Sequence, residues 1–497
     1  MHQFICIPIT ETNAISFIAA IEEAVPLADI IELRLDYLTD AEREQVLKNL
    51  ASRENPKPLL FTFRPREQGG MRDSSLENRL HFWQSLKPEV LKLILFADFE
   101  LDLVEHLADK IPPIPWDNVI CSNHNFDETP ANIDEIYDRI ARTPAAIIKI
   151  ATKVNQISDC LPLFELMERG EKPAIILGMG LPGISTRILA LSRGAMLTFG
   201  ALKRGAESAS GQPTATELRD LYRVHQLSKQ TEIYGVVGNP VGHSRSPLIQ
   251  NAAIQSVNRD AVYLPFEVDD IEIFLRDFVH PKTKRLDWNL RGLSVTIPHK
   301  INAMSHLDVI SSAAKTVGAI NTIIVKNNEL HGDNTDVAGA MKPLENLLEL
   351  KNTRVAILGA GGAARAICYG LKLRGAQLTI YARDLAKAKI LADEFGSEVG
   401  FLSEFSGDAD IVINCTPIGM QGHNEAASPI NPASLKNVQL VYDLIYNPLE
   451  TKLLRDAKNE GCQTLGGMAM LIGQATEQFR LWTDEEVAPE VMWNAIH

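Results

Sequence analysis

Short apolar runs alternate with helical patterns or loops along the first 200 residues of the chain. Eight such runs occur, at 4–9, 30–36, 58–64, 93–99, 119–126, 145–152, 173–180 and 195–201. Strands that alternate with helices are typical of a parallel sheet, and eight of them in a stretch of this length favour a closed (β/α)8 barrel. The sequence therefore predicts an α/β fold that begins with a TIM barrel.

A second α/β pattern begins at residue 233. Strand-like runs at 233–238, 261–268 and 290–297 are separated by helical stretches, and the run at 353–358 leads into a glycine-rich turn and a helix, which is typical of a Rossmann domain. An amphipathic helix predicted at 216–227 and a linker of about five residues join the two halves. We expect three domains: a barrel at 1–228, a substrate-binding domain at 229–336 completed by C-terminal helices at 470–497, and a Rossmann domain at 337–469.

Lys149 lies inside the sixth apolar run of the predicted barrel, which places an amine in the barrel interior. Burial there favours the neutral, nucleophilic amine. A snorkelling or ion-paired lysine explains Lys149 alone equally well. His124, late in the fifth run, would by itself be a satisfied core histidine. Next to an interior lysine on the neighbouring strand, it becomes a candidate general acid and base, so the pair favours catalysis.

Further polar residues mark the ends of the predicted barrel strands, where barrel enzymes carry their chemistry. Glu32, Arg34 and Asp36 alternate along one run, Arg64 closes the third, and Arg187 follows the seventh. Side chains two residues apart on a strand share a face. We therefore expect these groups to converge on one end of the barrel.

These segments resemble type I 3-dehydroquinate dehydratase, a Schiff-base enzyme of the shikimate pathway, over essentially residues 4–225. The matching stretches are 32–36 (ELRLD), 62–64 (TFR), 122–126 (SNHNF), 148–150 (IKI), 185–187 (STR), 198–200 (TFG) and 208–212 (SASGQ). The resemblance implies that Lys149 forms an imine with the substrate ketone and that His124 moves the protons. It also implies a set of substrate-binding residues: Arg187 for the carboxylate, and Glu32, Arg34, Arg64, Ser208 and Gln212 for the other oxygens.

One position departs from the pattern of this family. Gln68 stands where the family usually has a Glu that is hydrogen-bonded to the catalytic His. A neutral amide can orient an imidazole but does not stabilise its charged form as a carboxylate does. Either Glu67 takes over that task, or His124 titrates at lower pH in this chain.

The second half opens with a turn at 238–247 that carries two hydroxyls, Ser244 and Ser246, on either side of Arg245. Ser246 and Pro247 occupy the places of a helix N-cap and first helical residue. Arg245 is expected to point to solvent. Polar clusters follow at the ends of elements, at 295–300, 318–322 and 332–336. Each alone reads most simply as a turn or cap, but their ordered succession favours a binding site.

The glycine-rich turn after the run at 353–358 fits the pattern G-x-G-x-x-G/A in its required context. Such a turn lets backbone N–H groups and a helix N-terminus approach a pyrophosphate. About twenty residues on, where an NAD enzyme carries an acidic residue, the chain has Arg383 and Lys387, and Asp384 reads as a helix N-cap. We therefore favour NADP over NAD. The expected cofactor-binding residues are Gly359, Ala360, Gly361, Gly362, Ala363, Arg383, Lys387 and Asn414.

These motifs resemble shikimate dehydrogenase over about residues 233–497. The resemblance implies that Lys300 and Asp336 form the catalytic pair at the carbonyl that is reduced, because an ammonium there can stabilise and protonate the developing oxyanion. Ser294 stands where the family commonly has Asn. The substrate-binding residues that the resemblance implies are Ser244, Ser246, Thr296, Asn321, Thr335 and Gln474, with Tyr446 on the nicotinamide side.

Composition narrows the possible partners and location. The 497 residues carry a formal net charge of −14 with no Lys/Arg-rich block, which argues against nucleic acid and anionic membranes as partners. No apolar run approaches the roughly 18 residues of a membrane span, and the first residues do not read as a targeting segment. Six scattered cysteines without a C-x-x-C pair or an H-E-x-x-H helix predict reduced thiols, no metal and a cytoplasmic location.

The two resemblances together predict a bifunctional enzyme of aromatic amino acid and chorismate biosynthesis. Its first half would dehydrate 3-dehydroquinate to 3-dehydroshikimate, and its second half would reduce that product to shikimate with NADPH. Two alternatives stay open: another Schiff-base lyase joined to a quinate dehydrogenase, and a catalytically inactive regulator that senses these ligands. The intact Lys149, His124, Lys300 and Asp336 argue against the regulator. The pattern does not predict an oligomeric state.

Overall fold

The computed structural model describes residues 3–422 and 424–496. It contains two compact units, one made of Met1–Ser244 with Asp260–Leu290 and the other of Arg245–Arg259 with Arg291–His497. The outermost residues of the predicted domain ranges, 1–2 and 497, lie outside the described residues.

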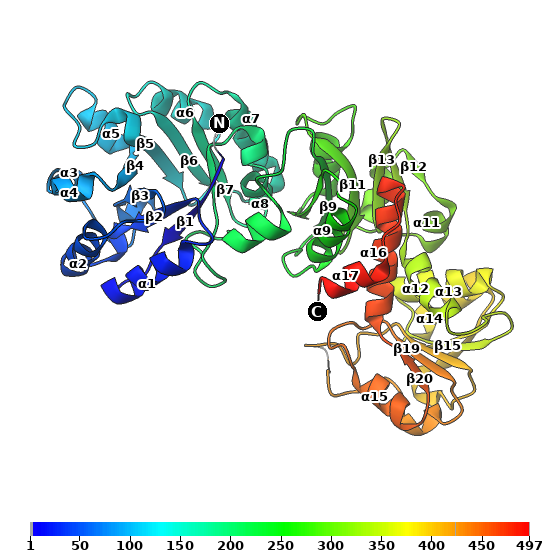
Figure 1. The fold of residues 1–497 in the computed structure, drawn as a ribbon. Helices are drawn as coiled ribbons and strands as arrows, with labels where there is room; N and C mark the ends of the chain where they lie inside the picture. The colour runs from blue at the N-terminus through cyan, green and yellow to red at the C-terminus, as the bar shows by residue number, and fades with distance from the viewer. Residues whose placement is uncertain (1–2, 423, 497) are drawn as a thin grey trace. The chain divides into compact units, whose positions relative to one another are not determined.

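The first unit contains the predicted barrel (Figure 1). Its eight parallel strands follow the order β7-β6-β5-β4-β3-β2-β1-β8. The ring closes where the main-chain N–H of Met196, just before β8, donates to the carbonyl of Ala174 on β7 at 2.8 Å. The strands are β1 (Phe4–Ile9), β2 (Ile30–Arg34), β3 (Leu59–Thr62), β4 (Ile94–Glu100), β5 (Val119–Asn125), β6 (Ile147–Lys153), β7 (Ala174–Met179) and β8 (Leu197–Phe199). The barrel prediction is confirmed.

Helices surround this barrel, and several begin at a side-chain cap. Asn13, Thr39 and Ser75 each accept a hydrogen bond from a main-chain N–H of the first turn that follows, which satisfies one of the unpaired donors at a helix start. The helices are α1 (Ala14–Ala24), α2 (Asp40–Ala51), α3 (Leu76–Gln84), α4 (Pro88–Leu91), α5 (Leu101–Leu107), α6 (Ile133–Ala141), α7 (Cys160–Glu168) and α8 (Ile184–Ile188). Apolar side chains such as those of Ile30, Ile120 and Ile175 belong to one core cluster of the strands.

Several barrel strands are shorter than predicted, and in β2 and β3 the difference affects predicted site residues. β2 ends at Arg34, so Asp36 lies in the 3-10 turn η1 (Leu35–Tyr37), and β3 ends two residues before Arg64. The turn at Asp36 allows its carboxylate to fold back onto Arg34 and accept two hydrogen bonds from it. The strict alternation assumed for this run from its sequence is therefore wrong beyond Arg34.

The helix predicted at 216–227 is wrong in its extent. The chain is helical only at 215–221, which includes the π-helical turn η6 (Glu217–Leu221), and Arg223 adopts a left-handed backbone with φ of 52°. A non-glycine residue in this region ends a helix and is uncommon. Its guanidinium donates to the carbonyl of Ala261 at 2.9 Å, a contact between distant parts of the chain that a local pattern does not encode.

The first unit continues past the barrel into β9 (Glu232–Gly238) and β10 (Ala261–Glu267), which pair in parallel from Glu232 with Ala261 to Gly238 with Glu267. The short helix α10 (Ile271–Phe274) and the turn η7 (Leu275–Val279) follow β10. Trp288 is buried beside Phe266 and Phe278 in this part of the unit.

The second unit begins with α9 (Ser246–Ser256), whose N-cap is Arg245. Ser246 is therefore the first helical residue and not the predicted N-cap. Arg245 is exposed, as expected. β11 (Asn289–Val295), β13 (Thr322–Lys326), β14 (Glu329–Asp333) and β12 (Val309–Ile310) lie side by side in this order, and α11 (Ser312–Val317) precedes β13. Of the remaining helices, α12 (Asp336–Glu345) packs against α16 (Gly467–Thr483), and α17 (Pro489–Asn494) packs against α9 and α16.

The Rossmann prediction is also confirmed. Six parallel strands follow the order β17-β16-β15-β18-β19-β20, which numbers as the 3-2-1-4-5-6 arrangement of dinucleotide-binding sheets. The strands are β15 (Arg354–Leu358), β16 (Gln377–Ala382), β17 (Glu398–Phe401), β18 (Ile411–Asn414), β19 (Leu440–Asp443) and β20 (Gln463–Leu465). The helices that belong to this sheet are α13 (Gly362–Leu373), α14 (Leu385–Phe395) and α15 (Lys452–Asn459).

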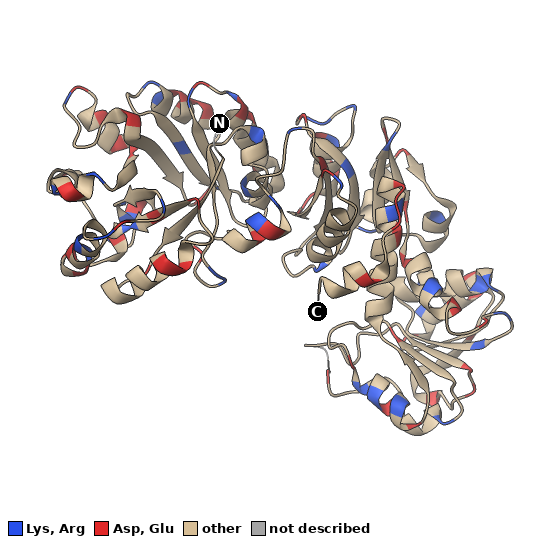
Figure 2. Cartoon of the chain, viewed as in Figure 1, with Lys and Arg blue, Asp and Glu red and all other residues tan. Residues whose placement is uncertain are grey.

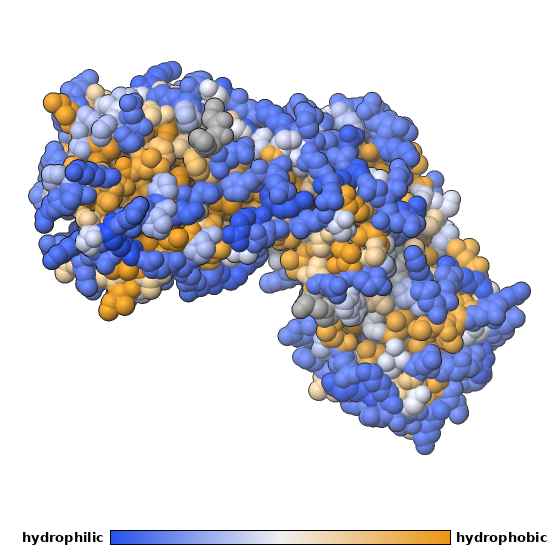
Figure 3. Space-filling model, viewed as in Figure 1, coloured by the Kyte–Doolittle hydropathy of each residue, from blue (hydrophilic) through white to orange (hydrophobic). Residues whose placement is uncertain are grey.

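Charged residues of both signs are interspersed over the helices and loops of both units (Figure 2). Hydrophilic residues make up most of the face that Figure 3 shows, and apolar residues appear between them. No helix among the described residues is long and apolar enough to cross a membrane. Within the same part of the chain, no cluster of His, Cys, Asp and Glu side chains is arranged to hold a metal ion.

Candidate active sites

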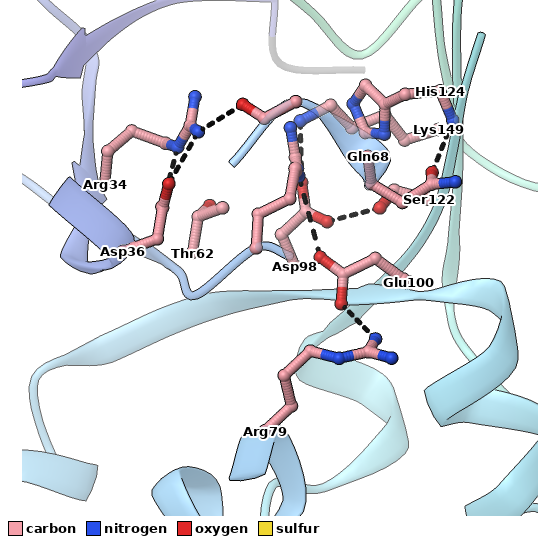
Figure 4. A network of polar contacts seen from close by, with 12 residues as sticks. Arg34, Asp36, Thr62, Gln68, Arg79, Asp98, Glu100, Ser122, His124 and Lys149 are labelled. Carbon is pink, nitrogen blue, oxygen red and sulfur yellow. Dashed lines mark hydrogen bonds and ion pairs between the residues drawn. The ribbon is translucent and has the colours of Figure 1, made fainter. Parts of the chain in front are cut away.

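Lys149 is buried inside the barrel on β6, and its amine meets a carboxylate there. Its Nζ lies 2.6 Å from Oδ2 of Asp98 (Figure 4). It also lies 4.0 Å from Oε1 of Glu32 and 4.7 Å from the centre of the Phe199 ring. The two interpretations of this lysine from the sequence, an interior amine and an ion-paired lysine, are thus both true of one residue. The ion pair lies among the predicted site residues.

Asp98 is the centre of this network and was missed from the sequence. It is fully buried on β4 and accepts hydrogen bonds from Ser122 Oγ at 2.5 Å, Arg64 Nη2 at 2.5 Å and Lys149 Nζ at 2.6 Å (Figure 4). Burial opposes its ionisation, but the positive charges of Arg64 and Lys149 hold the pKa of Asp98 well below its usual range. A carboxylate inside an apolar strand run was the signal that could have revealed it.

His124 lies on β5, directly beside the lysine strand, where Ser122 is paired with Lys149 and His124 with Ala151. Burial, together with the positive charges of Arg64 and Lys149, lowers the pKa of His124 well below its ordinary value. The imidazole is therefore neutral near pH 7 and able to accept a proton. Its Nδ1 is buried without a hydrogen-bond partner among the described residues.

Gln68 does not contact the imidazole ring of His124. Its Oε1 accepts a hydrogen bond from the main-chain N–H of His124 at 2.8 Å, which ties the turn η2 (Arg66–Gln68) to β5 (Figure 4). The neighbouring Glu67 is exposed. The pKa of His124 is lowered by burial and by Arg64 and Lys149, and the effect of position 68 on that pKa stays a prediction.

Arg187 lies on α8 and is 2% exposed, yet no carboxylate pairs with it among the described residues. Its Nε donates to the carbonyl of Gly178 at 3.0 Å, and burial lowers its pKa to about 10. A buried cation without an anion is costly unless a bound anion compensates it. Arg187 is therefore suited to bind an anionic group of a substrate.

The loop after β8 adds two more polar groups. The main-chain N–H and Oγ of Ser208 both donate to Oε1 of Gln212, at 2.9 and 3.0 Å. This orients the amide so that Nε2 of Gln212 is buried without a partner in the described structure. Ser208 and Gln212 line one pocket together with Arg204. The free Nε2 can donate a hydrogen bond to a substrate oxygen.

Two arginines hold the rim of the barrel site in place. Arg34 donates to Asp36 at 2.9 and 2.8 Å and to the carbonyl of Gly69 at 2.9 Å, which fixes the loop that carries Gln68. Arg79 on α3 donates to Glu100 Oε2 at 2.8 Å (Figure 4). These contacts anchor the segment between β3 and α3 to the strands.

Glu100 at the end of β4 was also missed from the sequence. Its Oε1 lies 3.6 Å from Nε of Arg64 and its Oε2 is bound by Arg79. Burial outweighs both arginines, with a further contribution from the charge of Asp98, and raises the pKa of Glu100 to about 7. The barrel site thus contains one carboxylate that is firmly ionised and one that titrates near neutral pH.

A second site lies in the second unit, where Lys300 and Asp336 form the predicted pair. Nζ of Lys300 lies 2.8 Å from Oδ2 of Asp336, and both side chains are partly accessible. Asn321 Nδ2 donates to the other oxygen of Asp336 at 2.9 Å and to Thr335 Oγ1 at 3.0 Å. The structure thus brings together four of the predicted residues.

The other predicted substrate residues of this site are distributed over several elements. Thr296 follows β11, Ser246 begins α9, and Gln474 lies on α16, where its Nε2 donates to the carbonyl of Leu471 at 3.1 Å. Ser244 belongs to the first compact unit. Tyr446 is exposed after β19.

Gln478 is hydrogen-bonded to residues of this site and was not predicted from the sequence. It is buried on α16, and its Nε2 donates to the carbonyl of Asn321 at 3.0 Å and to Thr322 Oγ1 at 3.1 Å. Its Oε1 accepts from Ser294 Oγ at 2.8 Å. Ser294, the departure from the second family pattern, is therefore bonded to α16. The helical spacing from Gln474 to Gln478 was the available signal.

The glycine-rich turn has the geometry that a dinucleotide requires. Gly359 adopts a φ of 105°, which favours glycine, and no atom lies within 4 Å of where a Cβ would stand on Gly361 or Gly362, the residues that open α13. This leaves room for a pyrophosphate against the helix N-terminus. Ala360 and Ala363 belong to the same turn and the first turn of α13.

The region beyond the second Rossmann strand carries the predicted cationic pair. Arg383 and Lys387 are exposed at the end of β16 and in the first turn of α14. Asp384 is the N-cap, as predicted, and accepts from the main-chain N–H groups of Ala386 and Lys387. Asn414 is buried, and its side chain donates to Asp443 at 3.0 Å and accepts from Thr416. That side chain braces the turn after β18.

The two sites define the class of the protein. The barrel holds a buried lysine, a neutral histidine and an arginine without a carboxylate partner in the described part of the chain, and these groups suit a lyase reaction through an amine. A Rossmann sheet joined to a Lys–Asp pair is built for a nicotinamide-dependent reduction.

Comparisons with known families and proteins agree with this class. Residues 5–229 match the model of type I 3-dehydroquinase, and residues 236–323 match the shikimate dehydrogenase substrate binding domain. Residues 342–427 match the shikimate / quinate 5-dehydrogenase model, and residues 467–497 match the shikimate 5'-dehydrogenase C-terminal domain.

Similar proteins include a bifunctional 3-dehydroquinate dehydratase/shikimate dehydrogenase, chloroplastic, from Arabidopsis thaliana, which is 34% identical over 98% of this chain and 83% of its own length. The NADP(+) shikimate dehydrogenase of Methanococcus aeolicus is 37% identical over 54% of this chain and 98% of its own. A crystal structure of a shikimate dehydrogenase in complex with NADP+ is 36% identical and covers 54% of this chain and 96% of its own, with a TM-score of 0.51.

The chain belongs to the family of bifunctional 3-dehydroquinate dehydratases/shikimate dehydrogenases. It is a lyase and an NADP-dependent oxidoreductase of the shikimate pathway.

Proposed function

We propose that Lys149 and His124 carry out the dehydration of 3-dehydroquinate and that Lys300 and Asp336 carry out the reduction of 3-dehydroshikimate. The observation that carries the first half of this proposal is the buried Lys149 beside Asp98 and a neutral His124. The observation that carries the second half is the Lys300–Asp336 pair in the same unit as the Rossmann sheet.

In the barrel, the ammonium of Lys149 gives a proton to the neutral imidazole of His124, and its Nζ adds to the substrate ketone. The hydroxyl of this adduct leaves as water with that proton, which gives a protonated imine and a neutral His124 again. The positive nitrogen withdraws electrons from the adjacent carbon, whose proton passes to the neutral imidazole of His124. The resulting enamine expels the β-hydroxyl, which leaves as water with a proton from His124. Hydrolysis of the imine releases the enone and the free lysine. Asp98, 2.6 Å from Nζ, stabilises the cationic nitrogen throughout.

The remaining residues of the barrel site bind the substrate. Arg187, which has no carboxylate partner in the described structure, receives the substrate carboxylate. The Nε2 of Gln212 donates to a substrate hydroxyl. The residues that we assign to the other oxygens are Glu32, Arg34, Arg64 and Ser208.

Borohydride trapping tests the covalent step. The enzyme is incubated with 3-dehydroquinate and borohydride, and a reduced adduct is expected on Lys149, located by peptide mass spectrometry. Lys153 lies on the same strand and is the internal comparison. A Lys149→Ala variant is expected to give no adduct. An adduct on Lys153 instead, or no adduct in the unaltered enzyme, would show that the proposed mechanism is wrong.

In the second unit, NADPH supplies a hydride when it is bound. Lys300 donates a proton to the oxygen of the substrate carbonyl as negative charge develops on it. Asp336 holds the ammonium in place, and Asn321 holds Asp336. Within this unit we assign the substrate oxygens to Ser246, Thr296, Asn321, Thr335 and Gln474, with Tyr446 beside the nicotinamide. Ser244, which the resemblance also implies, belongs to the first compact unit. The cofactor set is Gly359, Ala360, Gly361, Gly362, Ala363, Arg383, Lys387 and Asn414, the last through the turn that it braces.

A coupled assay tests both sites together. With 3-dehydroquinate as the starting substrate, oxidation of NADPH is expected, and a Lys300→Met variant is expected to accumulate 3-dehydroshikimate without oxidising NADPH. We assign shikimate rather than quinate to the second site. Faster turnover of quinate than of shikimate in the reverse direction would contradict that assignment.

We also propose the domain limits 1–228, 229–336 with 470–497, and 337–469, which are supported by the ranges of the family models. A cytoplasmic location is supported by six cysteines that are all free thiols. Fractionation of cells with an antibody against the chain tests the location.

A further inference from the structure

The first compact unit packs its barrel against residues 260–290, which lie within the range that matches the dehydrogenase substrate-binding domain. α8 of the barrel contacts β10, and the ring of Phe164 on α7 lies 6.1 Å from the ring of Trp288. Trp288 is buried in this contact. The α7–α8 side of the dehydratase barrel therefore rests on a segment that belongs in sequence to the other activity.

Arg193 is the buried polar centre of this contact. It lies in the 3-10 turn η5 (Leu191–Arg193) and is 5% exposed. Its Nη1 donates to the main-chain carbonyl of Asp287 at 2.6 Å and lies 3.3 Å from Oε1 of Glu168. A hydrogen bond from a buried guanidinium is stronger than one between neutral groups and holds its two segments in a fixed position.

The turn that carries Arg193 is continuous with the helix that carries Arg187. The main-chain N–H of Arg193 donates to the carbonyl of Leu189 at 3.1 Å, and that of Leu189 donates to Ser185 at 2.9 Å. Arg187 itself is held by its Nε bond to Gly178 and by a bond from Thr198 to its carbonyl. A shift of η5 therefore moves the short helix α8 and the guanidinium on it.

We propose that Arg193 is a positioning residue of the dehydratase: by binding the carbonyl of Asp287, it makes residues 260–290 a support for Arg187. The inference rests on the proposed role of Arg187 as the carboxylate-binding residue. A displaced cation on α8 weakens the binding of substrate more than the imine chemistry, because His124 lies on β5 and Lys149 on β6.

Steady-state kinetics of the full chain test this proposal. Arg193→Met is expected to raise the KM for 3-dehydroquinate roughly tenfold, as for the loss of one charged hydrogen bond, while kcat changes by less than about twofold. Arg193→Lys retains one donor and is expected to restore part of the lost affinity. The dehydrogenase KM and kcat for shikimate are expected to stay unchanged in both variants.

Arg285→Ala is the matched control on the same contact. Its guanidinium pairs with Glu165 at 3.3 Å, but both side chains are half exposed, and exposed pairs contribute little. No change in either activity is expected. If Arg193→Met fails to fold, Arg193→Gln, which has lost the charge, is measured in its place, and a KM equal to that of the unaltered enzyme overturns the proposal. Equal losses in kcat of both activities also overturn it, because they indicate general destabilisation.

Arg187→Met separates this inference from the proposed function. A large rise in KM in Arg187→Met with no change in Arg193→Met refutes only the positioning role. No change in Arg187→Met refutes the carboxylate assignment itself, whatever Arg193→Met shows.

Discussion

Replacing Asp98 by Asn is the sharpest test of the barrel site, because it removes one charge and nearly preserves the shape. Asp98 is fully buried and binds Arg64, Lys149 and Ser122 at 2.5 to 2.6 Å. The amide oxygen can still accept a hydrogen bond, but the two cations then share the interior without the carboxylate between them.

The magnitude follows from the contact with the reacting nitrogen. A hydrogen bond between charged groups contributes about 1.5–3 kcal/mol, and the imine nitrogen is cationic in the elimination step, so kcat is expected to fall roughly tenfold to hundredfold. Removing one partner of a buried ion pair also lowers the free energy of unfolding by about 3–5 kcal/mol. Because the charge of Asp98 raises the pKa of His124, its loss lowers that pKa further. The acidic limb of the kcat/KM profile is then expected to move to lower pH.

The assay follows the ultraviolet absorbance of the conjugated enone product across the pH range, with urea unfolding measured in parallel. Ser122→Ala is the control, since it removes one hydrogen bond from Asp98 and leaves the charges in place; a change in kcat of only a few-fold is expected. If Asp98→Asn retains kcat within about threefold of the unaltered enzyme, Asp98 does not stabilise the cationic intermediate and the reasoning fails.

Three further predictions concern the departure from the family pattern, the neutral-pH carboxylate and the cofactor. Gln68→Glu is expected to raise the apparent pKa of His124 in the dehydratase pH profile, and an unchanged profile would show that position 68 is uncoupled from the imidazole. The pKa of Glu100 is raised to about 7 in the fold, so its contribution to stability is fully present below its ordinary pKa and lost as pH rises through 7. The free energy of unfolding, measured with urea, is expected to fall by up to about 3 kcal/mol between pH 5 and pH 8, and Glu100→Gln is expected to abolish this fall. The same pH dependence of the free energy of unfolding in both proteins would refute the prediction. Replacing Arg383 and Lys387 together by Ala is expected to raise the KM for NADPH roughly tenfold or more and to leave that for NADH unchanged; an equal rise for both cofactors would argue against a 2′-phosphate contact.

In the proposed mechanism, the contacts of Lys149 serve both the stability of the barrel and the reaction. Before substrate arrives, the ammonium and the carboxylate of Asp98 satisfy each other inside the barrel. Once the imine forms, the same carboxylate faces a cationic nitrogen in the same place. The charges inside the barrel therefore change little during the reaction. Because the site needs little rearrangement, the free-energy barrier of the reaction is lower.

The sequence alone predicted the architecture, and it proposed the candidate reacting groups. Eight apolar runs separated by helical patterns predict a parallel barrel, and a glycine-rich turn behind a buried strand predicts a Rossmann sheet, because these periodicities are local consequences of burying one face. Lys149 and His124 stood out because ionisable residues inside strands are rare. Lys300 and Asp336 were assigned through motifs whose residue types fit the reaction.

The tertiary structure alone decided which groups meet. Lys149 and Asp98 are 51 positions apart, and Ser294 and Gln478 are 184 apart, so no local pattern reports their contacts. For the same reason, the sequence did not reveal that Arg187 has no carboxylate partner among the described residues. The absence of a partner is visible only when the surroundings of the buried side chain are known. The helix predicted at 216–227 ends before Arg223, whose left-handed backbone and contact with the carbonyl of Ala261 no local pattern reports. Contacts between segments far apart in the chain form only in the folded protein. The charged groups of the barrel site, such as Lys149 and Asp98, are paired by contacts of this kind.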